Sequence, residues 1–318
     1  MPTERVDAPH TNREGDVNEM EPLTQILTAT DFSARSMRAV DRAARLAHEH
    51  KATLHLVHVV DHLLLRMFAG DVDEHPVATE LRLMDTERGR LTELAGLLAS
   101  HFSITVLPVL LVGRVHAEVA RYAAEHGAEL SVLGAQGENF VRATLIGSSA
   151  SRYVRVGLQP TLVVRSEDKQ PYRSVLVALD FSPASKRALA TAIALAPKAT
   201  LRVLHVCELP LASRLPAKFR NKDTMASFRA TSEKQARTRL EAFLRDVPGA
   251  GSVTTAVQSG PAAKTIMRHA RAQHCDLLAL GKRGAFELNQ LLLGSVSLRL
   301  FEQFEGDLLL VPSDDQGA

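Results

Sequence analysis

Two stretches of the chain carry glycines and a serine at one common spacing, G-x2-G-x9-G-S. These residues are Gly134, Gly137, Gly147 and Ser148 in the first stretch, and Gly281, Gly284, Gly294 and Ser295 in the second. Glycine lets backbone amides come close to an anion. A Gly-Ser pair that begins a helix adds unpaired N–H groups, a hydroxyl and the positive end of the helix dipole. The pattern therefore predicts a loop that holds a polyphosphate, present twice.

A purely structural role for the same residues is also open. The glycines could serve only as turns, and Ser148 and Ser295 could be helix N-caps. The same spacing occurs in register in both halves, which favours an ancestral loop with one function in both copies. Turns with a purely structural role can also be retained after duplication.

An aspartate follows the first apolar run of each copy. Asp31 and Asp180 both precede Phe-Ser, and a helix begins directly afterwards. The aspartates could cap these helices, but Ser33 and Ser182 can do so instead, and Pro183 suits the first helical position after Ser182. We therefore predict that both aspartates face a ligand, as acidic residues that bind ribose hydroxyls do in related sheets.

Strands and helices must alternate to position these residues, because short apolar runs alternate with amphipathic stretches. In the first copy we expect strands at 26–30, 53–60, 104–110, 130–134 and 161–165, and helices at 34–48, 78–100, 115–126 and 148–157. The predicted class is α/β, with two tandem, doubly wound, Rossmann-like domains of five parallel strands. Ligands of such sheets bind beyond the carboxyl ends of the strands.

The domain limits follow from the repeat and from two polar segments. We expect a flexible N-terminal tail at 1–21, a first domain at 22–166, a linker at 167–173 and a second domain at 174–313. The tail is polar and lacks a hydrophobic period, and the linker is polar and contains a proline.

The composition is that of a soluble globular protein, with 45% hydrophobic and 23% charged residues and a net charge of +2. This balance argues against nucleic acid as the main partner. The apolar runs are too short to span a membrane, and residues 1–21 lack the apolar core of a signal peptide. We expect a cytoplasmic protein with no membrane contact and with Cys207 and Cys275 as free thiols.

Motifs of dedicated enzymes do not occur: there is no G-x-S-x-G, H-E-x-x-H, Walker or kinase signature. We expect at most weak ATP hydrolysis and assign no catalytic residue. Several histidines lie close together in the sequence, namely His48, His50, His55, His58 and His62. His55 and His58 are three apart on an expected strand and so face opposite sides. We therefore predict no metal site, apart from Mg²⁺ that could accompany a nucleotide.

The strand-ending aspartate before Phe-Ser, the Leu-His-Val of the second strand and the G-x2-G-x9-G-S loop resemble the universal stress protein family, twice over and across nearly the whole chain after residue 21. The resemblance implies an adenine-nucleotide-hydrolase-like fold that binds ATP or a related adenine nucleotide. It implies two sets of site residues: Asp31, Val59, Gly134, Gly137, Gly147 and Ser148, then Asp180, Val206, Gly281, Gly284, Gly294 and Ser295. It also implies that the last strands, at 161–165 and 308–311, pair the two domains, and it leaves a further homodimer open.

One departure from the family concerns phosphate charge. Many nucleotide-binding members carry a basic residue after the second glycine, where this chain has Glu138 and Ala285. Lys282 and Arg283 lie within the second glycine pair, so we expect the second site to bind ATP more tightly than the first. Three functions stay open: a nucleotide-dependent sensor or regulator of stress responses, a nucleotide-free scaffold, and a slow ATPase.

Overall fold

The computed structural model describes residues 23–61, 76–135, 147–208, 222–284 and 293–313. The elements of the first half are β1 (Gln25–Ala29), α1 (Ala34–His50), β2 (Thr53–Val60), α3 (Pro76–Phe102), β3 (Val106–Val112), α4 (Val115–Glu125), β4 (Leu130–Gly134), α5 (Ser148–Val156) and β5 (Thr161–Val164). The elements of the second half are β6 (Ser174–Leu179), α6 (Pro183–Leu195), β7 (Thr200–Cys207), α7 (Lys222–Arg245), a 3₁₀ turn (Ala250–Ser252), β8 (Thr254–Ser259), α8 (Ala262–Ala272), β9 (Leu277–Gly281), α9 (Ser295–Gln303) and β10 (Asp307–Val311). The predicted α/β class and the repeated strand and helix order are confirmed.

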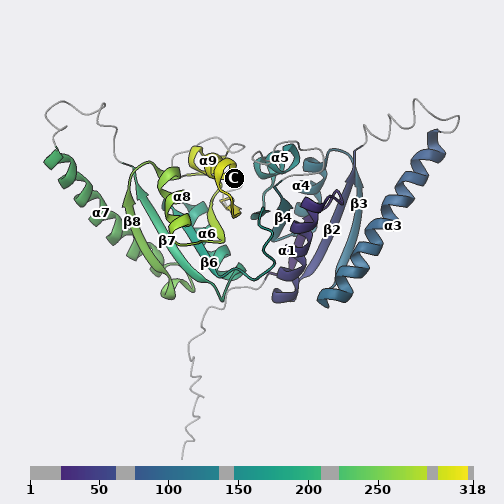
Figure 1. Ribbon diagram of the computed structural model, residues 1–318, viewed down its shortest axis with the longest axis horizontal. Helices are drawn as coiled ribbons and strands as arrows, with labels where there is room; N and C mark the ends of the chain where they lie inside the picture. The colour runs from purple at the N-terminus through teal and green to yellow at the C-terminus, as the bar shows by residue number, and fades with distance from the viewer. Residues whose placement is uncertain (1–22, 62–75, 136–146, 209–221, 285–292, 314–318) are drawn as a thin grey trace, which may run out of the picture.

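Each half contributes a parallel five-stranded sheet, and the two sheets are continuous. The strand order is β3-β2-β1-β4-β5-β10-β9-β6-β7-β8. Strands β5 and β10 pair antiparallel, with Leu308 opposite Val163 and Leu310 opposite Thr161. The pairing of the last strands is therefore confirmed. Figure 1 shows the halves side by side, with α3 and α7 at the two outer ends.

Helices cover both faces of the sheet. Neighbouring residues of a strand point to opposite faces. In β1, Ile26 packs in a cluster with residues of α1 and α3, whereas Leu27 packs in another with α4 and with Tyr153 of α5. In each half the strand order reverses at the first strand, because β1 lies between β2 and β4 and β6 lies between β7 and β9, and this leaves a crevice beyond the carboxyl ends of these parallel strands.

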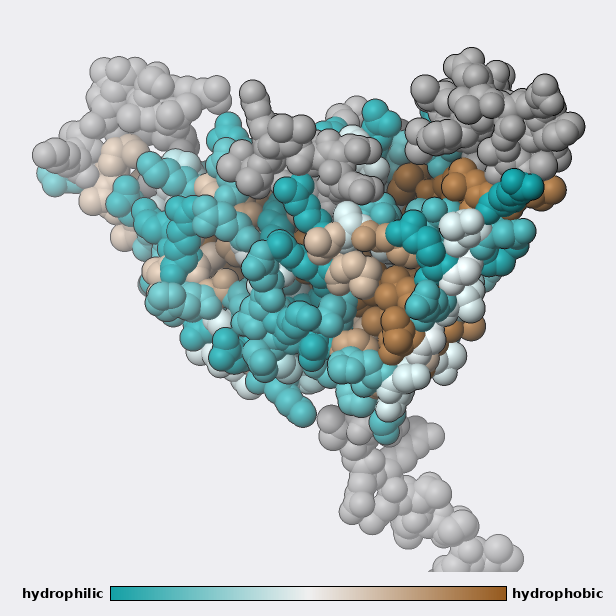
Figure 2. All heavy atoms as spheres, turned by 45° about the vertical axis from the view of Figure 1, so that its right-hand side comes forward, coloured by the Kyte–Doolittle hydropathy of each residue, from teal (hydrophilic) through white to brown (hydrophobic). Residues whose placement is uncertain are grey.

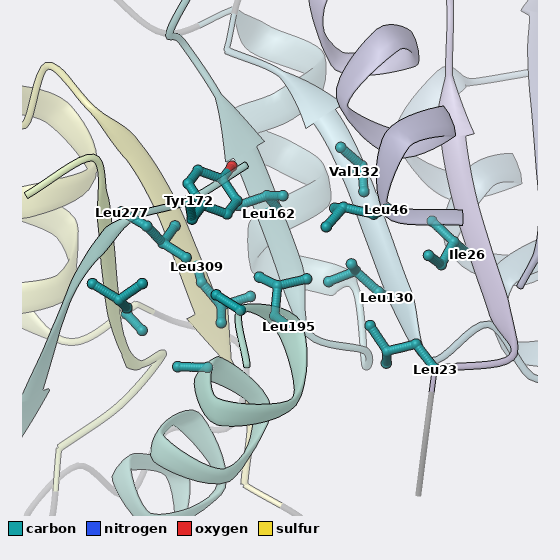
Figure 3. Close-up of a cluster of buried hydrophobic side chains, with 14 of the residues drawn as sticks. Leu23, Ile26, Leu46, Leu130, Val132, Leu162, Tyr172, Leu195, Leu277 and Leu309 are labelled. Atoms are coloured by element: carbon teal, nitrogen blue, oxygen red, sulfur yellow. The ribbon is translucent and has the colours of Figure 1, made fainter. Parts of the chain in front are cut away.

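The hydrophobic core runs through the junction between the halves. Figure 3 shows Leu162 of β5 and Leu309 of β10 close to Leu195 of α6, and all three side chains are buried in one cluster. Tyr172, from the segment at 167–173 that we expected to be a linker, is buried in the same cluster. This segment therefore adds to the contact between the halves.

A buried polar cluster accompanies this core. Asp307, at the start of β10, is inaccessible to solvent and accepts hydrogen bonds from the backbone N–H groups of Arg165 and Ser166, both at 2.8 Å. Its other oxygen accepts from the hydroxyl of Tyr172 at 2.7 Å and lies 3.9 Å from Nε of Arg42. Burial, and then the nearby Asp307 carboxylate, raise the pKa of Tyr172 well above its ordinary value. The two halves thus share one set of polar contacts.

The surface of the first half exposes several large hydrophobic side chains. They include Leu107 and Val112 on the edge strand β3, and Val156 and Leu158 near the end of α5. Figure 2, in which this half comes forward, shows hydrophobic side chains in brown among the hydrophilic ones. Over the described ranges, the helices are too short or too polar to cross a membrane.

Candidate functional site

A cavity of about 670 Å³ lies at the carboxyl ends of the first-half strands. Five of the six residues predicted for this copy line it: Asp31, Val59, Gly134, Gly147 and Ser148. The sixth, Gly137, lies outside the described residues. Residues from β1, β2, β4 and α5 therefore meet at the crevice, as the topology of a doubly wound sheet requires.

Serine caps both of the helices that follow the aspartates. Ser33 Oγ accepts from the backbone N–H of Ser36 at 3.1 Å, and Ser182 Oγ accepts from that of Ser185 at 3.1 Å. This part of the prediction is confirmed. Asp31 Oδ1 accepts from the N–H of Ser33 at 3.1 Å, which orients an exposed carboxylate beside the cavity.

In the second half, Asp180 makes the equivalent bond to the N–H of Ser182 at 3.0 Å and also accepts from the serine hydroxyl at 2.5 Å. The two aspartates thus occupy the same local structure, and the tight turn holds each carboxylate at the end of its strand.

The residue after each aspartate has an unusual backbone conformation. Phe32 and Phe181 have φ angles of 60° and 63°, in the left-handed region that bulky side chains rarely adopt. Each ring packs on a histidine of the second strand: the centroids of Phe32 and His58 are 4.7 Å apart, and those of Phe181 and His205 are 4.4 Å apart. The same strained conformation recurs at both crevices. Strained backbone residues cluster at functional sites in proteins, so this recurrence favours a functional role for the crevices.

These histidines are also held by the backbone. His58 Nδ1 lies 2.8 Å from the carbonyl oxygen of Thr30, and His205 Nδ1 lies 2.8 Å from that of Leu179. Burial lowers the pKa of His205. The packing of these histidines beside the strand-ending aspartates was not predicted from the sequence. The repetition of Asp-Phe-Ser and Leu-His-Val in both halves could have indicated it.

The beginnings of two helices also line the cavity. Val115 and His116 of α4, and Ser148 and Ser149 of α5, line it. Among the described residues no side chain caps either helix. The first N–H groups of each helix have no partner within the helix, and together with two helix dipoles they favour an anion here. The N-caps of α5 and α9 are Gly147 and Gly294, so the alternative in which Ser148 and Ser295 are the caps is wrong.

The second-half crevice brings its glycines close to other groups. A Cβ added to Gly284 would lie 2.9 Å from Oδ2 of Asp180, and one added to Gly281 would lie 2.9 Å from Cβ of Ala184. Gly281 thus requires glycine for lack of space, because its neighbours include backbone atoms, whereas at Gly284 the Asp180 carboxylate could move aside. Val206 lies on β7, and Gly294 and Ser295 begin α9, which corresponds to α5 of the first half.

Lys282 does not lie in the second crevice. Its side chain is buried, with 4% of the residue exposed, and Nζ donates to the carbonyl oxygen of Gly157 at the end of α5 in the first half. Burial, and then the charges of Arg283 and Arg187, lower the pKa of Lys282 to about 7. The expectation that Lys282 offsets phosphate charge in the second site is therefore wrong, because the side chain serves the contact between the halves.

The clustered histidines have separate partners. His55 lies 3.0 Å from the Tyr122 hydroxyl and 2.8 Å from Oε1 of Gln25, on the face opposite His58. His62 lies outside the described residues. Within the described ranges no group of three or more His, Cys, Asp or Glu residues is arranged to hold a metal ion.

Comparison with known proteins gives a consistent result for both halves. The sequence profile of the Universal stress protein family matches residues 22–165 and again 171–312. Universal stress protein MJ0531 of Methanocaldococcus jannaschii is 26% identical over 146 residues, which are 46% of this chain and 84% of the relative. Universal stress protein YxiE of Bacillus subtilis is 26% identical over 147 residues, covering 45% of this chain and 99% of the relative.

Solved structures show the same fold along more than nine-tenths of the chain. A universal stress protein from Archaeoglobus fulgidus aligns with a TM-score of 0.62 at 18% identity and covers 91% of this chain and 98% of its own. A functionally unknown protein from Pseudomonas aeruginosa aligns with a TM-score of 0.65 at 17% identity and covers 94% and 95%. At these identities the likeness concerns the fold alone.

Proposed function

Because the chain belongs to the universal stress protein family through both of its halves, we propose that it binds ATP or a related adenine nucleotide in the cavity of the first half. In this proposal the protein is a nucleotide-dependent sensor or regulator in the stress response. Binding shifts its contacts with a partner, without rapid chemistry.

The single observation that supports this most directly is the distribution of groups around the cavity. Asp31, which carries a carboxylate, and the beginnings of α4 and α5, for which no side-chain cap is found among the described residues, line the same cavity. A carboxylate accepts hydrogen bonds from ribose hydroxyls, and helix N-termini bind phosphates. The volume of about 670 Å³ also falls within the range of small-molecule sites.

Each predicted residue has a role in this arrangement. Asp31 binds the ribose, and the backbone at Val59 lies beside the adenosine part. The amides at Gly134 and Gly147 and the hydroxyl of Ser148 bind phosphates, and Mg²⁺ can accompany them. Asp180, Val206, Gly281, Gly284, Gly294 and Ser295 form the corresponding second site. The position of Lys282 removes one of the two reasons to rank that site above the first, and Arg283 is the basic residue of the second glycine pair that still supports this ranking.

The experiment is nucleotide identification followed by calorimetry. Nucleotide released from the purified protein is identified by chromatography, and ATP binding is then measured for the wild type, Asp31→Ala and Asp180→Ala. Asp31→Ala should weaken ATP binding about 10- to 100-fold, since a hydrogen bond to a charged group contributes about 1.5–3 kcal/mol. Asp180→Ala, the matched change in the other half, should leave first-site affinity unchanged.

Other outcomes distinguish the alternatives. A protein that stays empty in millimolar ATP and shows no thermal shift would contradict the proposal and favour a scaffold. Phosphate release above background that disappears in both aspartate variants would favour a slow ATPase.

A further inference from the structure

We propose that His116 contacts the terminal phosphates of the nucleotide and makes the first-half site selective for a nucleoside polyphosphate over a monophosphate. This inference rests on the proposed function, which it extends by naming the ligand class and a residue that recognises it.

The position of His116 is the first support. It is the second residue of α4 and lines the cavity together with Ser148 and Ser149 of α5. Helices α4 and α5 pack against each other, and Figure 1 shows them adjacent. A phosphate tail held at the beginning of α5 therefore extends toward the beginning of α4, where the imidazole lies.

The charges around His116 are the second support. Arg114, the N-cap of α4, and Arg152 of α5 both lie near enough to His116 to disfavour its protonated form. Burial is the largest cause of its lowered pKa, followed by Arg152 and then Arg114. Both arginines are exposed and lie outside the cavity lining, but their positive charge acts on the half-buried imidazole, and together with two helix N-termini it suits a multiply charged anion.

The other titratable groups lie on the remaining walls. Asp31 and Asp61 follow β1 and β2, and His58 lies on β2. Glu87 and Arg90 come from α3, where they form an ion pair at 3.2 Å, and Glu87 lies 3.7 Å from Nε2 of His58. Among the residues that line the cavity, the carboxylates of Asp31, Asp61 and Glu87 thus lie at the strand ends and on α3, whereas His116 lies at the beginning of α4, whose first turn also carries Glu118.

The second half provides an internal comparison. Its residues at the positions of Arg114 and His116 are Pro261, which is the N-cap of α8, and Ala263, which is buried. The fold thus accepts a proline and an alanine here. The histidine and arginine of the first half are not demanded by the helix start, which favours a role in binding.

A phosphate beside His116 should raise the pKa of the imidazole and cause it to take up a proton. Binding should therefore consume a fraction of a proton per ATP near neutral pH. Calorimetry in two buffers of different ionisation enthalpy measures this uptake. A residue with a purely structural role would not change it.

The test compares ATP and AMP binding to the wild type, His116→Ala and His116→Gln. In both variants we expect ATP affinity to fall about 10-fold, consistent with loss of one charge-assisted hydrogen bond. AMP affinity should change less than about threefold, and the ATP-linked proton uptake should be lost. His126→Gln is the matched control, because His126 lies at the opposite end of α4.

The outcomes separate the two proposals. A wild-type protein that binds neither nucleotide would contradict the proposed function. If the wild type binds ATP and the His116 variants keep the same ATP affinity, the same preference for ATP over AMP and the same proton uptake, the inference about His116 is overturned while the proposed function stands. His116→Ala should fold, because alanine occupies this position in the second half, and a thermal melt checks this directly.

Discussion

Replacing Asp307 by alanine is expected to lower the free energy of unfolding by about 3–5 kcal/mol, the usual cost of removing one partner from a buried charged cluster. The carboxylate is inaccessible to solvent and accepts from two backbone N–H groups and the Tyr172 hydroxyl. Its removal leaves these donors without their acceptor and leaves Arg42, 5% exposed, without the carboxylate at 3.9 Å.

Urea unfolding measures this loss for Asp307→Ala and Asp307→Asn. Asparagine keeps the size and one acceptor oxygen, so it should cost less than alanine. A double-mutant cycle with Arg42→Met isolates the contribution of the charge pair. A loss below about 1 kcal/mol for Asp307→Ala would show that the cluster does not hold the halves together.

The second large effect concerns Lys282 and pH. Its pKa is lowered from 10.5 to about 7 in the folded protein. Below pH 7 both states carry the proton, and the folded state bears the full cost of the buried charge. As pH rises above 7 the unfolded chain binds more protons at this site, so stability increases. Between pH 7 and 9 the gain should be on the order of 2 kcal/mol, at 1.36 kcal/mol per pKa unit.

Lys282→Met should remove this gain, so the difference in unfolding free energy between wild type and variant should change with pH over that range. Lys282→Arg should remove it as well, because a guanidinium stays protonated. Lys198→Met, at an exposed lysine of the same half, controls for the loss of one positive charge. Parallel stability curves for the wild type and Lys282→Met would contradict the prediction.

Both effects arise where the halves meet, and this has a consequence for the sites. Lys282 follows Gly281 in the second glycine loop, and its amine bonds to the end of α5, whose beginning lines the first cavity. The backbone N–H of Gly294 bonds to the Lys282 carbonyl at 2.9 Å. One side chain therefore connects the second glycine loop with helix α5 of the first half.

The sequence by itself determined the duplicated strand and helix order, the serine caps and most of the residues that meet at the first crevice, whereas Val59 followed from the family resemblance. These features depend on the spacing of nearby residues and on the repeat between the two halves, and both can be read directly from the amino-acid sequence. Hydrophobic periodicity places each element, and the parallel order of a doubly wound sheet brings its strand ends together. The pairing of β5 with β10 followed from the family resemblance.

The tertiary structure alone decided the role of residues whose partners lie far away in the chain. Asp307 occupies the position that Pro160 has in the first half, and Lys282 that of Ala135, so the repeat offers no guide to either. Their side chains bond to Tyr172 and Gly157, each more than a hundred residues away. The partner of a buried polar side chain depends on which groups pack against it, and at the junction these groups are brought together only by the folded structure.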